Sequence, residues 1–428
     1  MSRYIFAMRT LLEKAETDPA APRNAHYTGK EAEVVKGDVF PAELRSFRDE
    51  TTGALVYQLT NHLCHSCHLY FTHCPYYAHG TKMLFHSDRA NSQNLYELDL
   101  TNFQIRQLTE YSPEEPGVEP FAACVNPVRD EAFFWTGKYL RAIDLVTLEE
   151  RNLCEMPEGV RCLTPSCSAD GAYVYFAVNP IITEGLRIDR LRNQPFSRDY
   201  CAAKPHCSIK RIPTDGGEVE TVWEEDCWIG HVNTSPNDPN LLTFCHEGPW
   251  AMIDQRIWGL NPARGRVWKI RPQTEGEIIG HEYWFADGSR VGYHGKDKQG
   301  RFVWGHADPM GSGFADCILP RNSTHFHSLD ASLVVGDGSV LDPHLMLWRW
   351  NGEAYEGRLL MQHRCSFHVQ NLHCHPALVP KWVHFGFEAQ NPDSPHKKPQ
   401  YVLFTADIGP YGNIFVVEIP DFENLPHI

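Results

Sequence analysis

The sequence lacks two features that would place it among membrane or nucleic-acid-binding proteins. It has no run of about 18 consecutive apolar residues, which excludes a transmembrane helix. It also lacks an excess of basic residues. The 428-residue chain has 39 Lys and Arg against 54 Asp and Glu, a formal net charge of -15. Because nucleic-acid binding relies on clustered positive charge, we expect neither a nucleic acid nor a membrane among the partners.

A secretory signal peptide is also missing. Arg9 and Glu13 interrupt the apolar start of the chain, and no small-residue cleavage site follows them. We expect residues 1–44 to form an N-terminal extension with a short amphipathic helix, and the protein to be cytoplasmic. In a cytoplasmic chain, the 14 cysteines are expected to be free thiols or ligands rather than disulfides.

Helical periodicity is scarce after residue 20, and short strand-like runs take its place. Apolar, β-branched and aromatic runs recur between Gly, Pro, Asn and Asp. One strand–turn–strand unit recurs seven times, from "GTKMLFHSDRANSQNLYELDLTNFQIRQLTE" to "QYVLFTADIGPYGNIFVVEI". A repeat of roughly 40–50 residues with about four strands per unit is typical of a β-propeller.

The seventh unit lacks a late strand, and the N-terminal segment "FRDETTGALVYQLT" could supply it. Closing the ring in this way would remove exposed sheet edges. We therefore predict an all-β protein, a seven-bladed β-propeller over residues 45–428. The alternative is a pair of β-sandwiches, which seven similar units without a linker disfavour.

Histidine is abundant, with 23 residues, and several lie in unusual contexts between the strands of successive units. In a propeller such loops gather at one end of the ring. In "QNLHCHP", His373 and His375 are two residues apart, so in an extended strand they point to the same face. With Gln370 upstream, they could bind a transition-metal ion, whereas a closed structural zinc site would more often use Cys. The alternative for each histidine is a structural role.

The segment "CHSCH", residues 64–68, matches the C-x-x-C-H pattern of haem attachment. Covalent attachment of haem requires an exported chain, which disfavours this interpretation. A small zinc site is a second alternative, made from Cys64, Cys67, His73 or Cys74. We expect instead that these residues line a strand and a loop near the mouth of the ring.

Seven motifs connect the chain to a known family. They are "WIGH", "FCHEGP", "DQRIW", "HEYW", "SLVVGDGS", "QNLHCHP" and "YVLFTAD". In order and content the sequence resembles the oligogalacturonate lyases of polysaccharide lyase family 22, from about residue 45 to the end. The resemblance implies a site for Mn²⁺, or another divalent ion, formed by His325, Gln370, His373 and His375. It also implies catalytic roles for Arg256, as the base, and His281. We expect His231, His246 and Glu247 to bind the substrate.

Two points stay open at these positions. The segment "HFHSLDAS" is one residue shorter than the family pattern, so His327 competes with His325 as the metal ligand. Arginine has a pKa above about 12 and could act as a base only if desolvated beside another cation. The alternative role for Arg256 is to clamp a carboxylate with its planar guanidinium.

The chemistry of β-elimination fits these residue types. The proton on C5 of a hexuronate is removed and the C4 oxygen leaves, while a metal ion on the carboxylate stabilises the charge that develops. We predict metal-dependent β-elimination of short oligogalacturonides from pectin, giving unsaturated monouronates. The alternatives are a lyase for a different uronide glycan and a non-catalytic propeller scaffold. A homodimer is left open.

Overall fold

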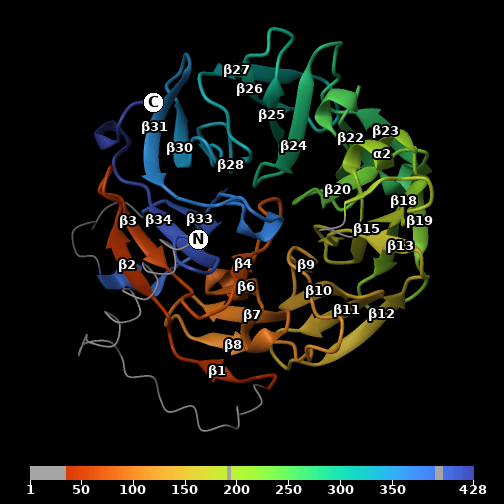
Figure 1. Ribbon diagram of the computed structural model, residues 1–428, viewed down its shortest axis with the longest axis horizontal. Helices are drawn as coiled ribbons and strands as arrows, with labels where there is room; N and C mark the ends of the chain where they lie inside the picture. Colours follow the sequence, from red (N-terminus) through yellow and green to blue (C-terminus); the bar gives the residue numbers. More distant parts are fainter. Residues whose placement is uncertain (1–34, 190–193, 391–398) are drawn as a thin grey trace, which may run out of the picture. The chain divides into compact units, whose positions relative to one another are not determined.

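The computed structural model describes residues 35–189, 194–390 and 399–428. Within these residues, seven antiparallel sheets follow one another around a ring, each built mainly from consecutive strands (Figure 1). This arrangement confirms the predicted seven-bladed β-propeller. The predicted N-terminal helix falls in residues 1–34, which lie outside the described residues.

Blades 1 to 3 come from the first half of the chain. Blade 1 contains β4 (Ser66–His68), β5 (Tyr76–Tyr77), β6 (Lys82–Ser87), β7 (Asn94–Asp99), β8 (Ile105–Gln107) and β1 (Val39–Phe40). Blade 2 contains β9 (Ala123–Val125), β10 (Glu131–Thr136), β11 (Tyr139–Asp144) and β12 (Glu150–Glu155). Blade 3 contains β13 (Val160–Cys162), β14 (Ser166–Cys167), β15 (Tyr173–Pro180), β18 (Cys207–Pro213) and β19 (Glu220–Glu225).

Blades 4 to 6 are regular four-stranded sheets. Blade 4 contains β20 (Ile229–Thr234), β21 (Leu242–His246), β22 (Ile257–Asn261) and β23 (Arg266–Lys269). Blade 5 contains β24 (Ile278–Trp284), β25 (Val291–Lys296), β26 (Phe302–Ala307) and β27 (Phe314–Leu319). Blade 6 contains β28 (Phe326–Ser328), β29 (Leu333–Gly336), β30 (His344–Trp350) and β31 (Tyr355–Gln362).

Blade 7 joins the two ends of the described chain. It contains β32 (Ala377–Leu378), β33 (Tyr401–Ala406), β34 (Asn413–Glu418), β3 (Leu55–Gln58) and β2 (Arg45–Arg48). Val56 of β3 pairs with Val417 of β34, so the N-terminal segment closes the ring as the sequence predicts. Strand β1, inside the predicted 1–44 extension, pairs with β8 of blade 1. The proposed boundary between residues 44 and 45 stays a prediction.

Helices are few and short in the described part of the chain. A hairpin of β16 (Ile188–Asp189) and β17 (Gln194–Pro195), with helix α2 (Ser197–Ala202), is inserted between β15 and β18 of blade 3. The described residues also contain seven short 3₁₀ helices, six between strands and the last after β34: Ala78–Gly80, Arg89–Asn91, Trp250–Met252, Pro262–Arg264, Gln370–Leu372, Gly386–Gln390 and Phe422–Asn424. No helix among the described residues is both long and apolar enough to span a membrane.

Apolar side chains on both faces of the central strands pack neighbouring blades together. Met83 of blade 1 belongs to the same buried cluster as Leu403 of blade 7. Trp135 of blade 2 meets Phe176 of blade 3 edge-on, with ring centroids 5.0 Å apart. Each sheet lies between two others, which explains why its middle strands read as nearly continuous apolar runs rather than alternating ones.

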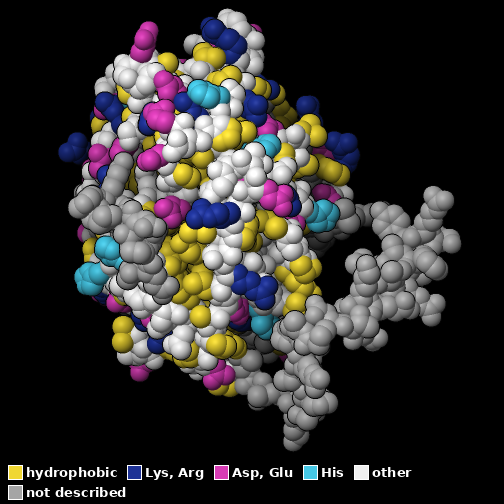
Figure 2. Space-filling model, turned by 90° about the vertical axis from the view of Figure 1, so that its left-hand side faces the viewer, with side chains coloured by type: hydrophobic (Ala, Val, Ile, Leu, Met, Phe, Trp, Pro, Cys, Tyr) yellow, Lys and Arg dark blue, Asp and Glu magenta, His cyan; other side chains and the backbone are white. Residues whose placement is uncertain are grey.

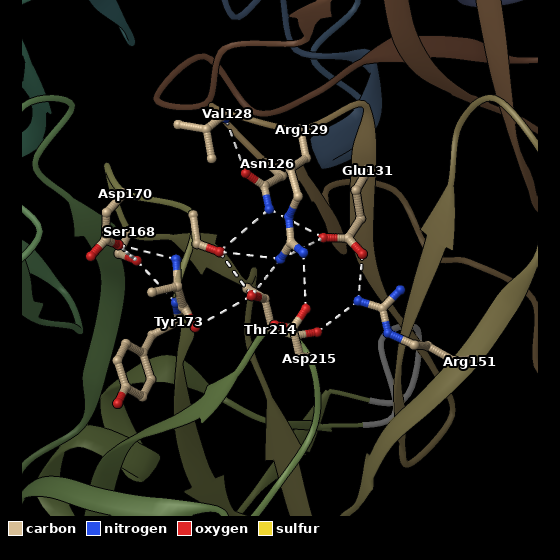
Figure 3. A network of polar contacts seen from close by, with 12 residues as sticks. Asn126, Val128, Arg129, Glu131, Arg151, Ser168, Asp170, Tyr173, Thr214 and Asp215 are labelled. Carbon is tan, nitrogen blue, oxygen red and sulfur yellow. Dashed lines mark hydrogen bonds and ion pairs between the residues drawn. The ribbon is translucent and has the colours of Figure 1, made fainter.

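A polar network supports the junction of blades 2 and 3 (Figure 3). Arg129 donates to the Thr214 hydroxyl at 2.6 Å and to Asp215 at 2.9 Å, and Arg151 pairs with Glu131. Thr214 in turn donates to the carbonyl of Gly171. On the face drawn in Figure 2, basic and acidic side chains lie intermingled rather than in areas of one sign.

Candidate metal and catalytic site

The candidate residues lie on the strands nearest the ring axis or in the loops beside them. In sheet order, β4, β20, β24, β28 and β32 end their blades on the side away from the outer strands (Figure 1). These five strands and the loops beside them supply Tyr70, His231, His281, His325, His373 and His375. Residues from five blades thus meet at the centre of one ring.

Three histidines form a group that can hold a metal ion. One ligand atom from each of His325, His373 and His375 lies within 4.8 Å of the others. The ring centroids of His325 and His375 are 4.2 Å apart, and His373 lies 5.6 Å from each of them. His373 and His375 therefore converge, together with a third histidine from blade 6, but not through the predicted extended strand, because residues 373–376 form no strand and His375 has a φ of 45°.

A buried carboxylate orients His325. Its Nδ1 lies 2.6 Å from Asp337 Oδ2, and its backbone N–H donates to Asp337 Oδ1 at 2.8 Å. Both side chains are almost fully buried. A carboxylate can only accept here, so Nδ1 carries the proton and Nε2 presents its lone pair. Metal-binding histidines commonly have such a carboxylate partner.

Gln370 lies at the open side of this group. Its amide nitrogen lies 3.1 Å from His375 Nε2, and a half-turn of the amide would present the oxygen to the same place. Gln370 also lines a cavity of about 330 Å³, together with Phe121 and Arg161. Three imidazoles, one amide and a buried orienting carboxylate form a donor set that suits a divalent transition-metal ion.

The structure brings His325, and not His327, to the other two histidines. His327 Nδ1 accepts a hydrogen bond from the backbone N–H of Leu378, and its ring stacks on Tyr283. Burial lowers the pKa of His327 to about 3, with a further contribution from His68. His327 is a neutral structural histidine that joins β28 to β32.

Three of the central histidines have a left-handed backbone. The φ angles of His231, His281 and His375 are 46°, 48° and 45°. His231 and His281 lie where the pairing register shifts within β20 and β24, after Gly230 and Gly280. Such bulges redirect a side chain, and left-handed non-glycine residues are costly and cluster at functional sites. The repeated "IGH" of blades 4 and 5 is the sequence of this bulge.

Arg256 is a buried cation between two carboxylates. Its Nη1 and Nη2 donate to Glu247 at 3.1 and 3.3 Å, and its Nε donates to Glu282 at 3.3 Å. Burial opposes the charge, but Cys245, Glu247 and Glu282 outweigh it and raise the pKa of Arg256 well above its usual range. The guanidinium is only 1% exposed. This environment disfavours the role of base.

His231 and Glu282 carry two buried polar atoms that make no hydrogen bond in the described part of the chain. His231 Nδ1 and Glu282 Oε1 lie 3.7 Å apart, and neither makes a hydrogen bond within the described residues. The Nε2 of His231 lies 3.5 Å from Glu247. Burial opposes ionisation of Glu247, but Arg256 and His231 lower its pKa to about 2. Unsatisfied polar groups of this kind call for a functional explanation.

His281 presents a free lone pair next to the metal group. Its Nδ1 lies 2.7 Å from the carbonyl oxygen of Thr324, which can only accept, so Nδ1 carries the proton. The Nε2 has no hydrogen-bond partner among the described residues. The ring stacks on His325 with centroids 4.9 Å apart. A neutral imidazole held in this tautomer can accept a proton.

Two predicted features lie away from this site. His246 hydrogen-bonds to Glu225 on the outer strand of blade 3 and packs on Trp258. Its side chain therefore does not lie beside Glu247, with which it was predicted to bind the substrate. Among the described residues, the two groups that could hold a metal include none of Cys64, Cys67, His73 and Cys74. The second of these groups, His231, Cys245 and Glu247, already has the Arg256 cation against it.

Sequence reasoning missed three residues of the site. Asp337 lies in "SLVVGDGS" and Glu282 in "HEYW", two motifs whose other residues drew attention. Tyr70 lies in the "CHSCHLYFTHC" segment, where the cysteines suggested a different chemistry. An acidic residue directly after a candidate catalytic histidine was the available signal for Glu282.

The chain is similar to known proteins over most of its length. A family model described as oligogalacturonate lyase matches residues 34–346. The oligogalacturonide lyase of Pectobacterium atrosepticum is 27% identical over 419 residues, covering 91% of this chain and 99% of that protein. The oligogalacturonate lyase of Dickeya dadantii is 26% identical over 418 residues, with the same shares covered.

Two solved structures share the fold of this chain. An oligogalacturonate lyase in complex with manganese has a TM-score of 0.77 and 25% identity, covering 91% of this chain and 99% of that one. An oligogalacturonate lyase from Vibrio parahaemolyticus has a TM-score of 0.77 and 26% identity, covering 90% and 99%.

Proposed function

The chain belongs to the oligogalacturonate lyase family, and from this premise we propose that it cleaves short oligogalacturonides by metal-dependent β-elimination. The family makes it a lyase, which sets aside the scaffold alternative. The observation that carries the metal dependence is the convergence of His325, His373 and His375, with Asp337 behind His325. A bound divalent ion would neutralise the substrate carboxylate and make the C5 proton more acidic.

The protein residues would divide the remaining work. We assign His281 Nε2 as the base that takes the C5 proton, because its tautomer leaves that lone pair free. The C5–H electron pair becomes the C4–C5 double bond, and the C4–O pair leaves with the oxygen. This assignment differs from the one that the family resemblance implies, in which Arg256 is the base.

Arg256 would act through its charge. Three of its five N–H groups are used on Glu247 and Glu282, and the side chain is almost fully buried. Glu247 and Glu282 therefore separate Arg256 from the position that the substrate would occupy. The field of Arg256 favours negative charge on the substrate in the transition state, and it holds Glu247 in place beside His231.

Incubation with digalacturonate and with a matching glucuronate disaccharide tests the proposal. We expect one saturated and one unsaturated monouronate from digalacturonate, detected by mass and by the ultraviolet absorbance of the new conjugated double bond. Two saturated monouronates would show a hydrolase instead. Faster cleavage of the glucuronate substrate would support the alternative of a lyase for another uronide.

A further inference from the structure

Tyr70 enters the site from a blade that supplies none of the metal-binding or catalytic residues described above. It follows β4 of blade 1 and lies between the two halves of the site. Its ring meets His375 with centroids 5.0 Å apart, and meets His231 edge-on at 5.5 Å. The phenol thus lies between His375 of the candidate metal site and His231, which lies beside Glu247 and Glu282, the carboxylates that pair with Arg256.

The loop holds Tyr70 in a fixed position. Phe71, 2% exposed, packs on the rings of His325 and His375 at 5.4 and 6.0 Å. The carbonyl of Tyr70 accepts the backbone N–H of His73 at 2.8 Å, which closes a tight turn. A side chain on this turn, anchored by its buried neighbour, needs little reorganisation to act on a bound substrate.

The hydroxyl of Tyr70 is an unused donor. Among the described residues it makes no hydrogen bond, whereas Tyr283, deeper in the ring, is bonded to Ser328 and Trp304. An ordinary phenol has a pKa of about 10, so it keeps its proton at neutral pH. The carboxylates around Arg256 are acceptors only, and Arg256 itself is shielded.

We propose that Tyr70 is a further catalytic residue, whose hydroxyl donates a hydrogen bond to the C4 oxygen as that oxygen leaves. This inference rests on the proposed β-elimination. The C5 proton passes to the base, the C4–O electron pair goes to the departing oxygen, and this oxygen then takes a proton from water. A hydrogen bond aimed at this oxygen stabilises the negative charge that develops on it. The segment that looked like a haem or zinc motif would then serve to place this phenol.

The test compares Tyr70→Phe with Tyr283→Phe in the full-length, manganese-loaded protein. Tyr70→Phe removes only the hydroxyl and keeps the ring against His375. We expect kcat on digalacturonate to fall about 10²–10³-fold, as for other single donors to a developing oxyanion, with KM and bound manganese unchanged. Tyr283→Phe removes a hydroxyl bonded within the core, and should lower stability but not kcat.

A second substrate separates this role from a structural one. With a uronate that carries an aryloxy group at C4, the oxygen leaves without help, so the loss in Tyr70→Phe should shrink to less than about tenfold. An equal loss on both substrates, a rise in KM alone, or a normal kcat on digalacturonate would each overturn the proposal. Failure of the wild-type protein to cleave digalacturonate would instead contradict the proposed function itself.

Discussion

At the scale of single residues, the site combines neutral imidazoles with one heavily compensated cation. Burial lowers the pKa of His281 and His375 well below the usual value, and nearby histidines, His325 first, add to the effect. Neutral rings offer the lone pairs that a metal ion needs. Although the chain has a net negative charge, the site could bind an anionic substrate through a metal ion held by these ligands. It would not need a surface of lysines.

The role of Asp337 is tested by Asp337→Asn. Because the carboxylate fixes the tautomer and the orientation of His325, its loss should weaken manganese binding about 10–100-fold. Activity should return at excess manganese, since mass action refills a weakened site. The matched control is Asp342→Asn, which breaks an Asp–His bond of 2.8 Å to His344 outside the metal group. Equal manganese affinity in both variants would contradict the assignment.

The role of Arg256 is tested by comparing Arg256→Lys with Arg256→Met. If its contribution is charge, lysine should lose about tenfold in kcat and methionine more than a hundredfold, since one full charge is removed from beside the site. Methionine should also cost about 3–5 kcal/mol in the free energy of unfolding, because Glu282 is left buried and uncompensated.

A matched buried arginine gives the control. Arg271→Met removes a cation bonded to Glu277 and Asp316, away from the metal group, and should lower stability without lowering kcat. Arg256→Lys as inactive as Arg256→Met would show that the guanidinium fork, as a direct contact or as the base, is required.

At the scale of elements, turns and bulges decide where side chains point. The bulges in β20 and β24 turn His231 and His281 toward the ring axis, and Gly280 allows this because a Cβ there would lie 2.7 Å from Trp250. The turn before β15 likewise brings Gly171 of blade 3 against Asn126 of blade 2, and Thr214, which follows β18 of blade 3, also bonds to Gly171 in the network of Figure 3.

This blade junction is tested by Gly171→Ala, with Gly53→Ala as its control. Both glycines have positive φ, +69° and +72°, so each substitution costs about 1–2 kcal/mol in backbone strain. At Gly171 the new Cβ would also lie 2.4 Å from Val128 Cγ2, whereas nothing lies within 4 Å at Gly53. Thermal unfolding should show the larger loss at Gly171. Equal losses would mean that the turn has room to relax.

At the scale of the whole molecule, the sequence predicts the repeated blades but not the positions where side chains from different blades meet. The apolar runs and the missing strand of the last unit predict seven blades and their closure by the segment at residues 47–60, because strand alternation and edge pairing are local rules. The left-handed histidines, Asp337 behind His325 and Tyr70 between two halves of the site depend on contacts across blades. No local pattern encodes such contacts, which is why the cysteines beside Tyr70 were more conspicuous than the tyrosine.

Ring closure is tested by two truncations. Removing residues 1–60 deletes β1, β2 and β3, and exposes the edge of β8 and the edge of β34, where Val56 had paired with Val417. We expect aggregation and loss of a cooperative thermal transition, because an unpaired hydrophobic edge recruits other chains. Removing residues 1–34 deletes none of the described strands and should leave the transition in place. A monodisperse, folded 61–428 chain would show that the N-terminal strands are dispensable.

The central claim is that a divalent ion held by His325, Gln370, His373 and His375 makes this propeller a uronate lyase. The most direct measurement is a manganese titration of the chelator-treated protein, recording bound metal and the rate of unsaturated uronide formation from digalacturonate on the same samples. We expect the rate to rise in proportion to occupancy and to saturate at a single ion per chain, with no such rise in the His373→Ala/His375→Ala variant. A full rate in the metal-free protein, or stoichiometric binding without unsaturated product, would contradict the account.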